Sequence, residues 1–260
     1  MRIVVIGGTG LVGSKLVQEL TERGHDAVAA SPRTGVNALT GEGLSDAIDG
    51  AAVVVDVSNS PSFEDAAAME FFVGSTTKLL AAEAMAGVGH HVALSVVGTD
   101  RLAPQNGYFR AKLAQQMLIA AGPIPYSVVH ATQFFESIRT IADSATIGDT
   151  VRLPSALIAP MASSDVAEAV ADAAVGDPLN GIIEVVGPAQ FDLPELIRTA
   201  LTARGDPRRV VADPAARYWG VELSERTLLP ADGALVSETH FEDWILEVAA
   251  KGGRTDSPTT

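Results

Sequence analysis

The stretch MRIVVIGGTGLVGSKLVQELTERG, residues 1–24, decides the fold. Arg2–Ile6 is a β-branched run that predicts a strand, and residues 11–23 have the apolar spacing of a helix that ends at Gly24. Three evenly spaced glycines, Gly7, Gly10 and Gly13, mark the turn between the strand and the first turn of the helix. A strand, a glycine turn and a helix in this order begin a βαβ unit.

The glycines of such a unit have separate tasks. One makes the tight turn, one lets the backbone approach a pyrophosphate, and one lets the helix pack on the strand. The N–H groups that begin the helix then face the phosphates. We therefore expect a dinucleotide site, the alternative being a purely structural turn, because glycines also occur in ordinary strand–helix turns. The predicted contacts are Gly7, Thr9, Gly10, Leu11, Val12 and Gly13.

The end of the second expected strand, residues 27–30, predicts the type of cofactor. Sites that prefer NAD place a carboxylate there for the ribose 2′-hydroxyl, whereas an arginine accommodates a 2′-phosphate. This chain has no acid at that point, and Ser31 and Arg33 follow the strand. The sequence favours NADP(H), with NAD(H) left open; in the other interpretation Arg33 is a solvated loop residue.

Strands and helices then continue to alternate. Strands are expected near Val36 and at 52–56, 92–97 and 126–129, and helices at 44–48, 63–85 and 109–121. This pattern predicts a Rossmann-type, doubly wound parallel α/β sheet. Ligands bind beyond the carboxyl ends of such strands, so Val57, Ser58 and Asn59 are also expected at the cofactor.

After about residue 131 the alternation loosens. We expect a strand at 151–153, a helix at 165–175 with Ser164 as its N-cap, a strand at 182–186, and helices at 191–203 and 238–250. Residues 1–250 are interpreted as a single domain, with a nucleotide-binding core at about 1–130 and a small α+β substrate cap at about 131–250. The polar residues 251–260 are expected to be disordered.

The composition excludes several classes. The chain has 260 residues, no cysteine and a formal net charge of −14. Thiol catalysis and cysteine-bound metals are excluded, and the acidic charge opposes nucleic-acid binding. No apolar run is long enough to cross a membrane. We expect a cytoplasmic protein with a small-molecule substrate, no metal, and either a monomeric or a homodimeric state.

Three side chains predict acid–base chemistry. Tyr108 and Lys112 are four residues apart at the start of an expected helix and so share one face. A nearby ammonium favours the phenolate and lowers the pKa of a tyrosine. Ser95, on the preceding strand, carries a hydroxyl that can bind a substrate oxygen. Singly, each has a structural explanation, since such tyrosine–lysine pairs are common on helix surfaces.

These motifs resemble the short-chain dehydrogenase/reductase superfamily, in particular its atypical, NmrA-like branch. The similarity covers about 140 residues and rests on GGTGLVG at 7–13, on Ser95 and on the YxxxK pattern of Tyr108 and Lys112. It implies that Tyr108 transfers the substrate proton, that Lys112 lowers the tyrosine pKa and binds the nicotinamide ribose, and that Ser95 orients the carbonyl. The chain departs from the family pattern at His130, where an arginine is usual.

The resemblance leaves three functions open. The first is an NADP(H)-dependent oxidoreductase that reduces a small carbonyl or quinone compound, with Gln133, Phe134 and Phe135 lining the substrate pocket. The second is a non-catalytic NADP(H)-binding regulator that senses redox state. The third is a nucleotide-sugar epimerase, disfavoured because the segment after residue 131 is short for that class.

Overall fold

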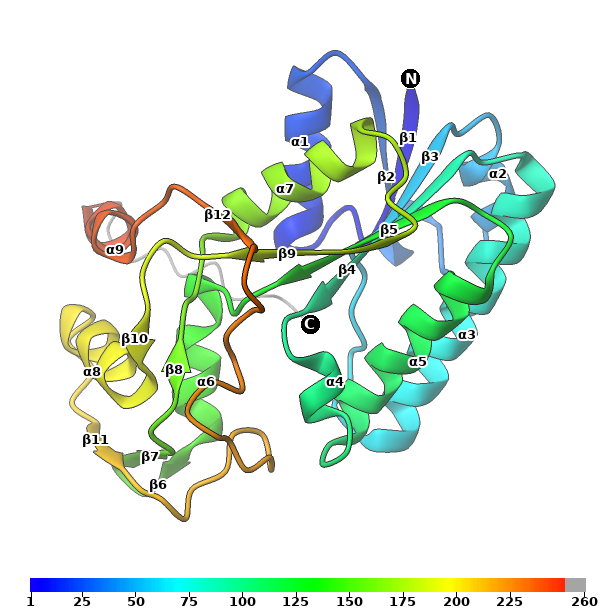
Figure 1. Cartoon of the computed structure of the whole chain (residues 1–260). Coiled ribbons are helices and arrows are strands. Elements are labelled where there is room, and N and C mark those ends of the chain that lie inside the picture. The colour runs from blue at the N-terminus through cyan, green and yellow to red at the C-terminus, as the bar shows by residue number, and fades with distance from the viewer. Residues whose placement is uncertain (251–260) are drawn as a thin grey trace.

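The computed structural model describes residues 1–250; the tail predicted at 251–260 lies outside these residues. A seven-stranded sheet forms the centre, in the order β12-β9-β5-β4-β3-β1-β2, and every pair in it is parallel (Figure 1). Its strands are β1 (Arg2–Ile6), β2 (Asp26–Ala30), β3 (Val53–Asp56), β4 (His90–Val96), β5 (Tyr126–Ala131), β9 (Gly181–Val186) and β12 (Leu235–Val236).

Helices cover both faces of this sheet, which confirms the doubly wound α/β prediction. One face carries α1 (Leu11–Glu22) and α7 (Ser163–Val175), whose Leu16 and Val170 pack on strand residues such as Val5. The other face carries α2 (Leu44–Ile48), α3 (Asp65–Ala86) and α5 (Gly107–Ala121). Because alternate strand residues point to opposite faces, runs such as β3 are buried throughout.

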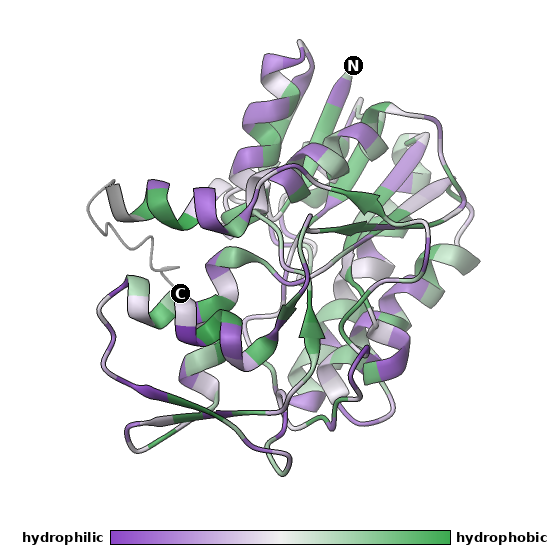
Figure 2. Cartoon of the chain, turned by 60° about the vertical axis from the view of Figure 1, so that its left-hand side comes forward, coloured by the Kyte–Doolittle hydropathy of each residue, from purple (hydrophilic) through white to green (hydrophobic). Residues whose placement is uncertain are grey.

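The cap is a smaller α+β layer beside the carboxyl ends of the strands (Figures 1 and 2). Its helices are α6 (Ile138–Ser144), α8 (Leu193–Ala203) and α9 (Phe241–Ala250). Its strands are β6 (Thr146–Ile147), β7 (Thr150–Leu153) and β11 (Arg209–Ala212), and the pair β8 (Leu157–Ile158) and β10 (Phe191–Asp192). Their core continues into α5 and the short α4 (Thr99–Leu102), so the cap packs firmly on the nucleotide-binding part.

The division between core and cap differs from the expected boundary at residue 131. Helix α7 and strands β9 and β12 follow that residue, yet they complete the central sheet and one of its helix layers. The chain leaves the sheet after β5, builds part of the cap, returns through α7 and β9, and leaves again. A boundary drawn along the sequence misses this return, because β12 has only two residues and both are exposed.

Two local expectations are also wrong. No strand forms at Val36; the chain there passes from the 3₁₀ turn η1 (Pro32–Thr34) into a loop with one isolated bridge, Asn37 to Glu42. Helix α7 begins at Ser163, with Ala162 rather than Ser164 at the N-cap position. The Ser163 N–H donates to the carboxylate of Glu136 at 3.2 Å, so a residue distant in sequence caps this helix.

Within residues 1–250, no helix combines the length and apolarity needed to cross a lipid bilayer.

Candidate active site

The glycine turn joins β1 to α1 with almost no room for side chains. Gly7 has φ +79° and donates its N–H to the carbonyl of Ala30 at 2.9 Å. A Cβ on Gly7 would lie 2.9 Å from the Ser58 backbone, and one on Gly13 would lie 2.1 Å from the Gly7 carbonyl oxygen. Gly7 therefore makes the turn, and Gly13 allows α1 to pack directly on it.

Gly10 is different, because a Cβ there would meet only the Gly7 oxygen, at 3.2 Å. It is the N-cap of α1 and supplies no capping side chain. The first internal helical bond runs from the Ser14 N–H to the Gly10 carbonyl at 3.0 Å, which leaves the preceding N–H groups directed out of the helix. This cradle suits an anionic pyrophosphate. The Val12 side chain packs into the core, so Val12 can offer only its backbone.

The end of β2 holds the residues expected at a 2′-phosphate. The Thr9 hydroxyl donates to the Ser31 hydroxyl at 3.0 Å, which places the glycine turn beside the end of β2. Ser31 is buried and caps η1 reciprocally with Thr34, whereas Arg33 within η1 is exposed. No carboxylate lies between Ala29 and Gly35.

The loop after β3 connects the cofactor side to α5. Buried Asp56 accepts hydrogen bonds from the Ser58 N–H at 2.9 Å and from the Ser58 hydroxyl at 2.6 Å. Next to it, the Asn59 side-chain oxygen accepts from the Tyr108 hydroxyl at 2.8 Å. The predicted cofactor loop and the predicted catalytic tyrosine therefore lie in contact.

Tyr108 has a higher pKa than its proposed activation requires. Burial raises the pKa of its phenol to about 12, and the hydrogen bond to Asn59 offsets only part of that effect. The ring packs against Phe72 at a centroid distance of 5.6 Å. Lys112 is not among the causes of this pKa shift, and its ammonium binds other groups, so the predicted lowering of the tyrosine pKa by Lys112 stays a prediction.

Lys112 is buried against β4. Its Nζ donates to the Leu94 carbonyl at 2.8 Å and to the Gln115 side-chain oxygen at 2.6 Å, and it lies 4.6 Å from the Phe72 ring centroid. Gln115 then donates to Asp56 at 3.0 Å. Burial lowers the pKa of Lys112 to about 8, with the charge of Asp56 acting in the opposite direction.

Ser95 belongs to a separate polar row. Its hydroxyl accepts from the Gln116 amide at 2.7 Å, and the Gln116 oxygen bonds to His130 Nε2 at 3.0 Å. Gln116 is eight residues from Tyr108 and thus about 12 Å along the helix axis. The described hydrogen bonds do not bring Ser95 to Tyr108, and Ser95, His130 and Glu184 instead lie side by side on β4, β5 and β9.

The bridging glutamines were missed in the sequence. Gln115 and Gln116 each use both ends of a side-chain amide, the first between Lys112 and Asp56 and the second between Ser95 and His130. Their spacing of three and four residues after Lys112 places them on the same helix face. That spacing is the signal in the sequence, since amide side chains three and four residues after a lysine lie within its reach on the helix surface.

The predicted substrate residues lie in different places. Phe135 is 1% exposed and packs against Phe241 in the cap core, so it is a packing residue rather than a pocket wall. Phe134 packs against the cluster between the sheet and α1 and α7. Gln133 is 9% exposed, and its side-chain oxygen has no hydrogen-bond partner among the described residues. It is the one of the three that can still accept a bond from a ligand.

The adjacent histidines His90 and His91, on β4, point to opposite faces of the sheet. His90 Nε2 bonds to the Ser127 hydroxyl at 2.9 Å, and His91 Nδ1 bonds to both carboxylate oxygens of Glu83. Burial lowers the pKa of His90 to about 4. Over the described part of the chain, no group of three acidic or histidine side chains is arranged to hold a metal ion.

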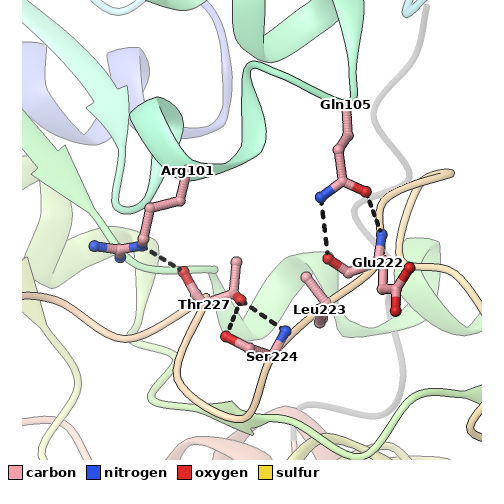
Figure 3. A pocket seen from close by; sticks show the side chains of 6 residues that line it. All are labelled: Arg101, Gln105, Glu222, Leu223, Ser224 and Thr227. Carbon is pink, nitrogen blue, oxygen red and sulfur yellow. Dashed lines mark hydrogen bonds between the residues drawn. The ribbon is translucent and has the colours of Figure 1, made fainter.

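Beside α4, the segment after β11 borders an open surface pocket of about 640 Å³ (Figure 3). Arg101 donates to the Thr227 carbonyl at 3.2 Å, and Gln105 exchanges hydrogen bonds with the Glu222 backbone. Leu223 projects between these groups. The contacts fix this part of the cap to the end of β4, next to the start of α5.

One family model matches the sequence: that of the NAD dependent epimerase/dehydratase family, over residues 3–72. No curated protein matches. The matched region contains the glycine turn, β2, β3 and the first part of α3. The NmrA-like branch stays a prediction.

Solved structures resemble nearly the whole chain. UDP-glucose 4-epimerase from Thermotoga maritima is 16% identical, with a TM-score of 0.75, 96% of this chain and 99% of that chain being covered. MoeE5, solved with UDP-glucose and NAD, is 18% identical, with a TM-score of 0.74 and the same coverage. A short-chain dehydrogenase/reductase superfamily protein from Agrobacterium tumefaciens, with bound NAD, is 20% identical, with a TM-score of 0.71 and 96% of each chain covered. The chain therefore has the Rossmann-like fold that these proteins share.

Proposed function

We propose that the chain is an NADP(H)-dependent oxidoreductase that reduces a small carbonyl or quinone compound. The observation that carries this proposal is the contact between Tyr108, at the start of α5, and Asn59, in the loop that follows β3. It brings a phenol to the edge of the sheet where dinucleotides bind in this fold.

The cofactor would be held along the carboxyl ends of β1, β2 and β3. Its pyrophosphate fits the N-terminus of α1, and the 2′-phosphate fits the end of β2, where no acid opposes it. The proposed contacts are Gly7, Thr9, Gly10, Leu11, Val12, Gly13, Ser31, Arg33, Val57, Ser58, Asn59 and Lys112. When bound, NADPH supplies a hydride from its nicotinamide ring.

Tyr108 is the proposed proton donor. Because its pKa is raised to about 12, the phenol keeps its proton at neutral pH and is suited to give it to a developing alkoxide. A substrate oxygen would replace Asn59 as the acceptor. At this pKa little phenolate is present at neutral pH, so the protonated phenol is the form available to the reaction. The Ser95 hydroxyl accepts from Gln116 and keeps its own proton to donate, but no described hydrogen bond joins it to Tyr108, so its proposed role is secondary.

A redox-sensing regulator is the second candidate. It is favoured by the engaged state of the two residues: the Tyr108 hydroxyl is bound to Asn59, and Lys112 is bound to Leu94 and Gln115. A regulator needs the cofactor site but no free phenol. It would bind NADPH and not consume it.

A nucleotide-sugar enzyme is the third candidate. MoeE5 and the Thermotoga epimerase were solved with UDP-glucose, and this chain aligns with 99% of each. The expectation that the cap is too short for this class is therefore wrong. A UDP-sugar substrate is distinguished from a small carbonyl compound by direct binding.

Tyr108→Phe tests the proposal. We expect turnover of NADPH with an aldehyde or quinone panel to fall at least a hundredfold, while the Kd for NADPH changes less than twofold. The control is Tyr126→Phe, which removes a hydroxyl at the start of β5, away from the site. Retained turnover in Tyr108→Phe would remove this residue from the mechanism. NADPH binding with no turnover by the native chain would favour the regulator, and turnover or binding of UDP-sugars alone would favour the third candidate.

The cytoplasmic location and the choice between a monomer and a homodimer stay predictions.

A further inference from the structure

Trp219 has a backbone conformation that is unusual for a bulky residue. Tyr218 and Val221 exchange two backbone hydrogen bonds of 2.9 Å, and the two residues between them have positive φ, +51° for Trp219 and +81° for Gly220. Asparagine or glycine normally occupies the first of these positions. A large side chain held there points to a task for the ring, since the turn itself would form more easily without it.

The hairpin is fixed to the helix that carries Tyr108. The Asn106 amide donates to the Trp219 carbonyl at 2.9 Å, and the Asn106 oxygen caps the first turn of α5 through the Phe109 N–H. In Figure 1 the segment after β11 runs from the cap toward α4 and the start of α5. One asparagine therefore sets both the start of the helix and the place of the tryptophan.

The ring of Trp219, which is half-buried, stacks on an exposed aromatic residue. Phe63, in the loop between β3 and α3, lies 5.4 Å from Trp219 between ring centroids, at an interplanar angle of 16°. Phe63 is 54% exposed, and its ring also lies 5.1 Å from that of Tyr108. Two nearly parallel rings, one from the core and one from the cap, thus stand beside the proposed proton donor.

We propose that Phe63 and Trp219 form an aromatic clamp that binds a planar conjugated carbonyl compound, such as an aryl ketone or a quinone, beside the Tyr108 hydroxyl. To admit a flat ring, the facing planes of Phe63 and Trp219 would need to move to about 7 Å apart, so that the inserted ring stacks on both. The Asn106 hydrogen bond holds Trp219 in place, so the displacement would come from Phe63 and the loop between β3 and α3 that carries it. A saturated ring has no π-face and is too thick for the same gap. The clamp rests on the proposed function for its carbonyl chemistry, and Trp219 is its specificity-determining residue.

The test compares two ketones that differ only in the ring. Acetophenone and cyclohexyl methyl ketone are titrated by calorimetry into the protein saturated with NADP⁺, which allows binding without turnover. We expect the native protein to bind acetophenone at least tenfold more tightly. Trp219→Asn keeps a residue suited to positive φ and removes the ring; it should remove this preference, and Trp219→Phe should retain most of it.

Trp244→Phe is the matched control, because Trp244 packs on Phe241 in the cap core. It should leave both affinities unchanged. Equal binding of the two ketones by the native protein, or an unchanged preference in Trp219→Asn, would overturn the clamp. Acetophenone binding that depends on Trp219, without turnover of NADPH, would support the clamp and refute the oxidoreductase. Turnover of NADPH without a preference for acetophenone would support the oxidoreductase and refute the clamp.

Discussion

Replacing Lys112 with methionine should change how stability depends on pH. The pKa of Lys112 falls from 10.5 to about 8 on folding, because burial disfavours its charge. The folded pKa is the lower one, so below pH 8 the native state carries a buried ammonium at a cost. As the pH rises from 8 to 10.5, the native lysine loses its proton before the unfolded one does, and the protein gains stability.

The magnitude follows from the pKa difference. A shift of roughly 2.5 units corresponds to about 3.4 kcal/mol, of which about 3 kcal/mol is regained between pH 7 and pH 10.5. Methionine does not titrate, so the Lys112→Met variant should lack this gain. The variant also loses the hydrogen bonds to Leu94 and Gln115, which changes its free energy of unfolding by a constant amount and leaves the pH dependence of that free energy unaltered.

The assay is urea unfolding followed by circular dichroism at several pH values from 7 to 10.5. The difference in free energy of unfolding between the native protein and Lys112→Met should change by about 3 kcal/mol over this pH range. Lys78→Met, which changes an exposed lysine on α3, is the control and should run parallel to the native curve. Parallel curves for the native protein and Lys112→Met would refute the burial of a charged lysine at this site.

Three further outcomes are expected. Gly13→Ala should destabilise the fold by about 3 kcal/mol or prevent folding, because its Cβ would lie 2.1 Å from a carbonyl oxygen. The control Gly89→Ala, whose Cβ would lie 3.6 Å from the nearest atom, should be nearly neutral. Equal free energies of unfolding for the two variants would contradict the packing argument. Arg33→Ala should weaken NADPH binding at least tenfold and NADH binding less than twofold in calorimetry, and equal losses would defeat the 2′-phosphate assignment. The pKa of His90 is lowered on folding to about 4, so the free energy of unfolding should fall by about 2 to 3 kcal/mol as the pH drops from 6.5 to 4. Chemical denaturation of His90→Asn should show a smaller fall over this range. The same pH dependence in the variant and in the native protein would contradict this assignment.

Local signals predicted the nucleotide-binding part well. The strand, the three glycines and the helix of residues 1–24 are neighbours in sequence, so their spacing alone predicts the strand–turn–helix unit. The early strands are apolar because they are buried on both faces, so their limits were nearly correct. The return of α7, β9 and β12 to the sheet depends on contacts between distant segments, which no local pattern records.

The candidate site was predictable in its residues but not in their state. The spacing of Tyr108 and Lys112 placed both on α5, yet their pKa values depend on burial and on Asn59 and Asp56, which reach them through the tertiary fold. Ser95 was placed correctly on β4, but its hydrogen-bond partner, Gln116, lies on α5 about two turns after Tyr108. The contact of Phe63 with Trp219 joins the core to the cap, and no local sequence pattern predicts it.

The central claim is that the glycine turn and the end of β2 together hold NADP(H). Its most direct test is a calorimetric titration of the native protein with NADPH and, separately, with NADH. We predict binding of both at the same single site, with NADPH at least tenfold tighter. Absence of binding by either dinucleotide would mean that the turn is only structural, and tighter binding of NADH would contradict the assignment of Ser31 and Arg33 to a 2′-phosphate.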